Sequence, residues 1–385
     1  MPEGVYNCRV CKTCGGCQLA HLSYGDQLLY KREEVSGLLS KFAEVEEIVG
    51  MAEPLRYRNK VQVSFGMAGE RIIYGNYVAS THEIVEVEDC LLCDEVANGI
   101  IALIARLAAK YHISIFDEHS YRGCLRHVLV RSSKLNEYMV VLVTGSFTIP
   151  HERELIGELR KAFPMIKTVV QSINNRHTSM VLGERQKVLF GRGYIYDELC
   201  GLVFKLSAVS FYQVNKSQTE VLYNKALEFA GLRGDETVVD AYCGIGTISL
   251  CLAKRAKQVI GVELNRQAIA DAVKNMHLNE VENAAFVSDD AGRFMSKMAR
   301  ERCHVDVVVM DPPRSGADKK FMDSVIRLRP EKIVYVSCNP VTLAANLAYF
   351  SRYYRVERIC PVDMFPYTKH VETVVLLSRN KARKG

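Results

Sequence analysis

From about Ser207 onward, short apolar runs rich in β-branched residues alternate with segments of helical pattern, such as residues 265–279. Strands that alternate with helices in this way form a parallel sheet with helices on both faces. The runs span residues 237–242, 258–264, 284–290, 306–311, 332–338 and 373–378. We therefore predict a doubly wound, Rossmann-like α/β fold for the second half of the chain.

Residues 55–205 have a different pattern, with strands joined by turns and two clear helices. The runs lie at residues 61–65, 71–75, 82–87, 127–133, 138–145, 168–173 and 187–191. This pattern predicts an α+β region with a mainly antiparallel sheet. A chain of 385 residues with 48% hydrophobic content is long and apolar enough for two cores. We place the domain boundary at 205/206, which gives domains 1–205 and 206–385.

Several classes of protein are excluded by the distribution of charge and hydropathy. The longest apolar stretch, residues 96–116, contains Arg106 and Lys110 and reads as an amphipathic helix rather than a membrane span. Residues 1–10 lack the pattern of a signal peptide, so we expect a cytoplasmic protein. The net charge of +6 permits a nucleic-acid partner but does not demand one.

A glycine turn follows the first strand of the second half. Gly244 and Gly246 stand where the strand gives way to a helix, which is the edge of a doubly wound sheet where ligands bind. Glu263 ends the next strand and is placed to accept hydrogen bonds from ribose hydroxyls. A dinucleotide site would have a third glycine where Ser249 stands. The turn favours S-adenosylmethionine, with a dinucleotide as the alternative.

Three further strand ends carry reactive or acidic side chains. Asp290 follows the third strand, where a carboxylate can meet an adenine edge, and Asp311 ends the fourth, ahead of two prolines that hold the chain rigid. Cys338 ends the fifth strand, and Glu372 stands at the entry to the last. A lone buried cysteine is usually a small hydrophobe. A cysteine and a glutamate that face one pocket suggest a nucleophile and a general base.

Together these segments resemble the RNA uracil-5-methyltransferase family. The matching motifs are FYQVN (211–215), DAYCGIGT (240–247), GVE (261–263), DPPR (311–314), SCNP (337–340) and HVET (370–373). The resemblance implies a class I methyltransferase domain, with Cys338 as nucleophile and Glu372 as proton acceptor. With the glycine turn and the third strand end, it gives as S-adenosylmethionine-binding residues Gln213, Tyr242, Gly244, Glu263, Asp290 and Asp311.

The chemistry of uracil explains why such residues are needed. C5 of the neutral, electron-poor ring is a weak nucleophile until a thiolate adds to C6 and forms an enolate. After methylation the C5 proton must leave so that the thiolate can be expelled, which requires a base. A cysteine thiolate is both a strong nucleophile and a good leaving group. The target base must be turned out of its stack to reach the pocket.

Thirteen cysteines, an odd number in a chain without an export signal, argue against a disulfide framework. Thiol groups at the N-terminus and after residue 89 suit either zinc or an iron–sulfur cluster. The resemblance implies a [4Fe-4S] cluster, because part of the family has the same spacing, and its ligands would be Cys8, Cys14, Cys17 and Cys90. Cys11 and Cys93 are additional and leave the ligand set open.

Contacts to RNA are predicted for residues 55–65, where basic and aromatic side chains alternate: Arg56, Tyr57, Arg58, Lys60 and Phe65. A solvated strand edge is the equal alternative. A weaker basic patch comprises Arg122, Arg126 and Arg131.

Many family members begin with an additional RNA-binding β-barrel, which we expect this chain to lack. RNA capture would then rest on residues 18–205 and the basic second half. The resemblance favours 23S rRNA as substrate for a monomer with no obligate protein partner. The alternatives are a tRNA uracil-5-methyltransferase and a non-catalytic iron–sulfur RNA-binding protein.

Overall fold

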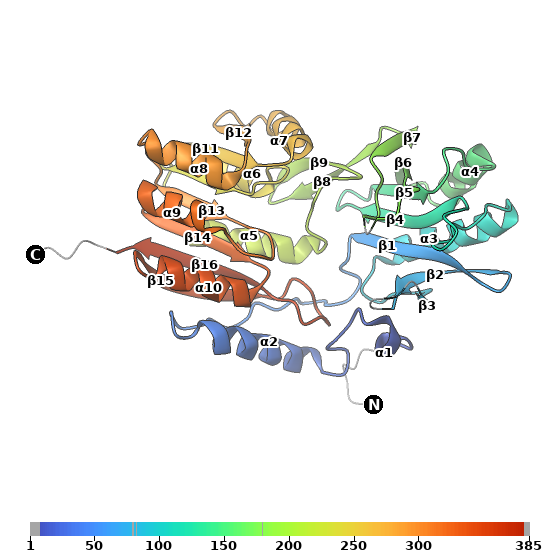
Figure 1. Cartoon of the computed structure of the whole chain (residues 1–385), viewed down its shortest axis with the longest axis horizontal. Helices are drawn as coiled ribbons and strands as arrows, with labels where there is room; N and C mark the ends of the chain where they lie inside the picture. Colours follow the sequence, from blue (N-terminus) through green and yellow to red (C-terminus); the bar gives the residue numbers. More distant parts are fainter. Residues whose placement is uncertain (1–7, 79–80, 82, 179, 381–385) are drawn as a thin grey trace, which may run out of the picture.

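The computed structural model contains two seven-stranded sheets and a two-stranded hairpin between them (Figure 1). It describes residues 8–78, 81, 83–178 and 180–380. The sequence-based interpretations that involve residues 1–7, 82 and 381–385 lie in part outside this range.

The first sheet confirms the predicted antiparallel region. Its strand order is β3-β2-β1-β4-β5-β6-β7, and every neighbouring pair is antiparallel except β5 and β6. The strands are β1 (Lys60–Ala68), β2 (Arg71–Tyr77), β3 (Ile84–Glu86), β4 (Leu125–Ser132), β5 (Tyr138–Thr144), β6 (Ile166–Ile173) and β7 (Arg185–Gly191). Two longer helices, α3 (Glu95–Lys110) and α4 (Glu152–Ala162), accompany them, as predicted.

The second sheet has the order β12-β11-β10-β13-β14-β16-β15. Its first five strands are parallel, and the last two are antiparallel to their neighbours. The strands are β10 (Thr237–Ala241), β11 (Gln258–Glu263), β12 (Ala284–Ser288), β13 (Val307–Met310), β14 (Lys332–Ser337), β15 (Tyr354–Val362) and β16 (Glu372–Arg379). Strand β15 was not predicted, because Arg355, Glu357 and Arg358 interrupt its apolar pattern.

Helices cover both faces of this sheet, as predicted. Alternate residues of each strand enter two different cores: Val238 and Val309 face one, whereas Val239 and Val308 face the other. The first core includes α5 (Lys216–Ala230), α6 (Thr247–Ala253) and α7 (Arg266–Leu278); the second includes α8 (Ala291–Arg300), α9 (Lys319–Leu328) and α10 (Pro340–Phe350).

An early segment of the chain packs on this second sheet. Helix α2 (Tyr24–Leu39) buries Val35 and Leu39 in the same core as α8, α9 and α10. The chain then forms parallel bridges with β15 at Val45 and Val49. Residues 24–49 thus lie beside α10, away from the first sheet (Figure 1). The boundary at 205/206 stays a prediction.

The two sheets share a continuous apolar core. Strands β8 (Tyr194–Leu199) and β9 (Leu202–Ser207) form the hairpin between them, and Phe204 is fully buried there. That core joins Met139 and Val141 of the first sheet to the α5 face of the second. Apolar contact across the junction fixes how the two sheets sit relative to each other.

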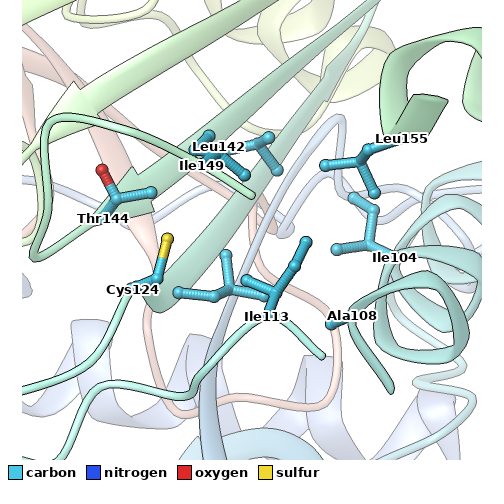
Figure 2. Close-up of a pocket in the computed structure, with 9 residues that line it drawn as sticks. Ile104, Ala108, Ile113, Cys124, Leu142, Thr144, Ile149 and Leu155 are labelled. Atoms are coloured by element: carbon cyan, nitrogen blue, oxygen red, sulfur yellow. The ribbon is translucent and has the colours of Figure 1, made fainter. Parts of the chain in front are cut away.

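A small cavity lies in the apolar core between the first sheet and its helices. Figure 2 shows it between apolar side chains of α3 and α4 and the Cys124 and Thr144 side chains. Its volume is about 10 Å³, which leaves no room for an organic ligand. In the described part of the chain, no helix combines the length and apolar character needed to cross a membrane.

Candidate active site

A cavity of about 680 Å³ opens at the carboxyl edge of the parallel strands. Its size is within the range of small-molecule sites. It brings together every residue that the sequence analysis assigned to the cofactor and to catalysis, namely Gln213, Tyr242, Gly244, Glu263, Asp290, Asp311, Cys338 and Glu372. Their roles remain predictions, but their convergence is a finding.

One end of the cavity fits the predicted cofactor. Gly244 has a φ of +55°, and a Cβ there would meet nothing within 4 Å, so its backbone is open to a ligand. The carboxylate of Glu263 accepts from the backbone N–H groups of Gly244 (3.3 Å) and Asn265 (2.8 Å). Asp290 caps α8 by accepting from the Arg293 N–H (2.8 Å). Carboxylates of this kind suit ribose hydroxyls and a cationic sulfonium.

Ser249 explains why the dinucleotide fingerprint is incomplete. Its hydroxyl donates to Asp240 Oδ2 beneath the glycine turn, where a third glycine could make no such contact. Asp240 is almost fully buried, and burial raises the pKa of its carboxyl to about 7. The turn therefore rests on an acid that is about half protonated near neutral pH.

The other end of the cavity holds the predicted catalytic pair. Burial raises the pKa of the Cys338 thiol, and the charges of Glu372 and Asp311 raise it further. Burial also raises the pKa of Asp311 to about 7 and that of Glu372 well above its usual range, with a second contribution from Asp311 to Glu372. Ionisation of one of these three acidic groups therefore disfavours ionisation of its neighbours in the pocket.

Arg314 offsets this effect. Its guanidinium lowers the pKa of both Cys338 and Glu372. The guanidinium also lies 3.1 Å from Nδ1 of His370. The backbone carbonyl of Arg314 accepts from Asn339 Nδ2 (3.0 Å) and Thr342 Oγ1 (3.1 Å). These bonds tie the loop after β13 to the loop that carries Cys338.

Some residues that line the pocket had no predicted role. Arg314 and His370 belong to the motifs DPPR and HVET, so the motifs themselves contained the signal. Phe365 and Phe211 also line the cavity, and Phe211 is 72% exposed. Phe211 belongs to the motif FYQVN, whereas no local pattern distinguished Phe365 from core residues.

The predicted RNA-contact residues are partly buried. Phe65 and Tyr57 are 3% and 6% exposed, so the expectation that their faces stack on bases was wrong. Phe65 packs in the core beneath the first sheet, and the Tyr57 hydroxyl donates to the Pro366 carbonyl (3.1 Å). The weaker patch is also wrong in part, since Arg126 pairs with Glu118 and Arg131 is buried.

The N-terminal thiols gather at one place without converging on a point. Cys8, Cys11, Cys17 and Cys90 pack around Tyr57, Leu92 and Tyr367. Asn76 Nδ2 lies 3.2 Å from the sulfur of Cys14. Yet within the described residues no three His, Cys, Asp or Glu side chains are grouped so as to hold a metal ion. The number and type of donors suit a cluster, and the cluster stays a prediction.

Comparison with known proteins identifies the family. The family model described as tRNA (uracil-5-)-methyltransferase matches residues 23–380. The chain belongs to this family. An uncharacterized RNA methyltransferase of Halalkalibacterium halodurans is 44% identical over 377 residues, which cover 96% of this chain and 82% of the relative. Another, from Clostridium tetani, is 42% identical with the same coverage.

A solved structure agrees with this assignment. The Pyrococcus abyssi tRNA (uracil-54, C5)-methyltransferase, in complex with S-adenosyl-L-homocysteine, is 28% identical with a TM-score of 0.79. The match covers 95% of this chain and 86% of that one. The RNA uracil-5-methyltransferase is thus an S-adenosylmethionine-dependent enzyme with the α/β methyltransferase fold, as the sequence predicted.

Proposed function

We propose that this RNA uracil-5-methyltransferase methylates C5 of a uridine in 23S rRNA through a covalent bond between Cys338 and C6. The observation that carries the mechanism is that Cys338, Glu372 and Asp311 line the same cavity as the cofactor residues. S-adenosylmethionine, when bound, would supply the methyl group to C5 with cleavage of its sulfur–methyl bond and would leave as S-adenosylhomocysteine. Glu263 and Asp290 would hold its ribose and adenine.

The thiolate of Cys338 adds to C6, and the electron pair of the C5–C6 double bond moves toward C5 and the adjacent carbonyl. Arg314 assists by favouring the thiolate over the thiol. Once C5 carries the methyl group, Glu372 takes the C5 proton. The pair of electrons from that C–H bond restores the double bond and expels the thiolate.

Glu372 must be ionised to act as this base. Burial, together with the charge of Asp311, raises its pKa well above the usual range and so disfavours the carboxylate in the protein alone. Arg314 favours the carboxylate, and so would the positive charge of the bound cofactor. We infer that binding of the cationic cofactor favours the carboxylate form of Glu372 and so helps it to act as the base.

The choice of 23S rRNA rests on the resemblance of the cysteine spacing to the cluster-bearing branch of the family. We propose that Cys8, Cys14, Cys17 and Cys90 hold a [4Fe-4S] cluster; the gathering of Cys8, Cys17 and Cys90 around Tyr57 and Tyr367 supports this. The mechanism contains no redox step, so the cluster would serve structure or RNA orientation.

A tRNA substrate is the second candidate. Both the family model and the Pyrococcus abyssi enzyme are named for tRNA. Mass spectrometry of rRNA and tRNA from a strain that lacks the protein separates the two. Loss of 5-methyluridine from 23S rRNA alone supports the proposal, whereas its loss from tRNA alone replaces it with the second candidate.

A further inference from the structure

A second large cavity, of about 720 Å³, lies at the junction of the two sheets. We refer to it as the junction pocket. Its walls come from residues 50–59, from the first turn of α5 and from the end of β4. Neither the catalytic residues nor the cofactor residues belong to it, so the chemistry described above leaves it without a role.

Basic side chains dominate this pocket. Arg56, Arg58, Lys134 and Lys216 line it, against the two acids Glu53 and Asp94. Asp94 is already engaged by neutral donors, namely Ser132 Oγ (2.9 Å), the Tyr138 hydroxyl and the backbone N–H of Ala97. It is therefore placed to cap α3 more than to neutralise a cation.

Two of the four cations have carboxylate partners. Arg56 pairs with Asp89, and Lys134 pairs with Glu220. Among the described residues, Lys216 and Arg58 form no ion pair; Lys216 Nζ lies 3.3 Å from Ser132 Oγ, and Arg58 lies over the ring of Tyr57. Burial lowers the pKa of Lys216, and the more distant charges of Asp197 and Asp94 oppose this shift. A partly buried cation without a direct ion pair still favours an anionic ligand.

The helix geometry reinforces this preference. Lys216 and Ser217 form the first turn of α5, a 15-residue helix capped by Asn215. The positive end of the helix dipole thus adds to the charge of Lys216 and Arg58. Leu55, which is 40% exposed, and Met51 give the same pocket an apolar wall. A phosphate next to a flat apolar group would match these two surfaces.

The junction pocket shares a wall with the active site. Gln213 and Val214 line the catalytic cavity, whereas Lys216 and Gln218 line the junction pocket. Because Lys216 follows Gln213 by three positions, their Cα atoms are at most about 11 Å apart. Asn59, which immediately precedes β1 of the first sheet, holds this shared wall in place, because its amide donates to the Gln213 carbonyl (3.0 Å). One RNA strand could therefore reach both cavities within a few nucleotides.

We propose that the junction pocket binds a second nucleotide of the substrate RNA, with Lys216 and Arg58 at its phosphate and Leu55 beside its sugar or base. This inference rests on the proposed function in that the substrate is RNA. It does not depend on which uridine or which RNA is methylated.

The test compares Lys216→Gln with Lys225→Gln. Both variants remove one positive charge from α5, but the two positions are about two and a half turns apart and so face opposite sides. Lys225 pairs with Glu228 and is not in the pocket. The probes are unmodified 23S rRNA and tRNA transcripts, with binding measured over a range of salt concentrations.

For Lys216→Gln we expect the affinity for RNA to fall about fivefold to tenfold, and the slope of log affinity against log salt to decrease by about 1. In methylation assays KM for RNA should rise by the same factor, with kcat and S-adenosylmethionine affinity unchanged. Lys216→Arg should restore most of the binding, and Lys225→Gln should behave like the parent.

Equal RNA affinity and salt slope in the two glutamine variants would overturn the proposal. So would a loss of kcat in Lys216→Gln without a change in KM, since that result would mean that Lys216 only supports the Gln213 wall. The binding assay separates this inference from the proposed function: a parent protein that binds RNA without methylating it would refute the latter alone.

Discussion

Lys31 and Asp363 form an ion pair of 2.6 Å in which both side chains are completely buried, although they are 332 residues apart in sequence. Lys31 belongs to α2, and Asp363 begins the loop between β15 and β16. Lys31 also donates to the Phe365 carbonyl (3.0 Å). The same loop delivers Phe365 and His370 to the catalytic cavity, immediately ahead of Glu372. The N-terminal helix therefore supports one wall of the active site.

We predict that Lys31→Met destabilises the protein by about 3–5 kcal/mol, because it leaves the Asp363 carboxylate buried without its partner. Urea denaturation measures this change. Arg176→Met is the control, since it removes an exposed ion pair with Glu184 and should cost less than about 1 kcal/mol. In the folded fraction, Lys31→Met should lower kcat more than it weakens S-adenosylmethionine binding. Equal stability losses in the two variants would contradict a structural role for the buried pair.

The two proposed catalytic residues should give opposite results in a trapping experiment. Cys338→Ala cannot form the covalent bond to C6, so it should bind RNA without forming an adduct. Glu372→Gln keeps the shape of the side chain but cannot take the C5 proton. It should accumulate a methylated protein–RNA adduct that survives denaturing electrophoresis. Turnover at the parent rate in Glu372→Gln would mean that another base acts, and Asp311 would be tested next.

The strand ends of the second half were predictable because parallel strands place their carboxyl ends at one edge of the sheet. That rule alone predicts that Asp311 and Cys338 lie close together, and both residues line the catalytic cavity. Glu372, at the start of β16, does not follow from this rule, because β16 runs antiparallel to β14. It was identified through its motif instead.

Contacts between distant segments were not predictable. The local sequence around Lys31 does not indicate which buried residue it pairs with. The sequence of α2 likewise did not predict that this helix packs on β15 and α10. The alternation of basic and aromatic residues at 56–65 indicated an RNA-binding surface. The same alternation, however, is that of a strand, and it places Phe65 of β1 on the face that is buried in the core. The burial of Phe65 depends on which face of β1 meets α3.

The thiol cluster gives a prediction about metal content. Anaerobically purified protein should contain about four irons per chain if four thiolates hold one cubane. Cys14→Ser should lose the iron and destabilise the region around residues 1–100, while S-adenosylmethionine binding should persist, because the described cofactor cavity contains none of these thiols. Iron analysis and calorimetric titration measure the two properties. Stoichiometric zinc in place of iron would reverse the cluster assignment, and normal methylation by Cys14→Ser would show that the cluster is dispensable.

The electrostatics around Cys338 predict how fast its thiol reacts with iodoacetamide at different pH values. At pH 8 Asp311 is mostly ionised, since its pKa is about 7, and its charge opposes formation of the Cys338 thiolate. Asp311→Asn should therefore lower the pKa of Cys338 and speed its alkylation.

Arg314→Gln removes the group that favours the thiolate, so the pKa of Cys338 should rise and its alkylation should slow by about twofold to tenfold. Mass spectrometry of the peptide that contains Cys338 follows this one site among thirteen cysteines. Cys303 lies outside the catalytic cavity, and the rate of its alkylation is an internal control that should not change. Because the two substitutions shift the pKa in opposite directions, a general loosening of the fold cannot imitate the result. Faster alkylation of Cys338 in both variants would mean that exposure, rather than charge, controls the nucleophile.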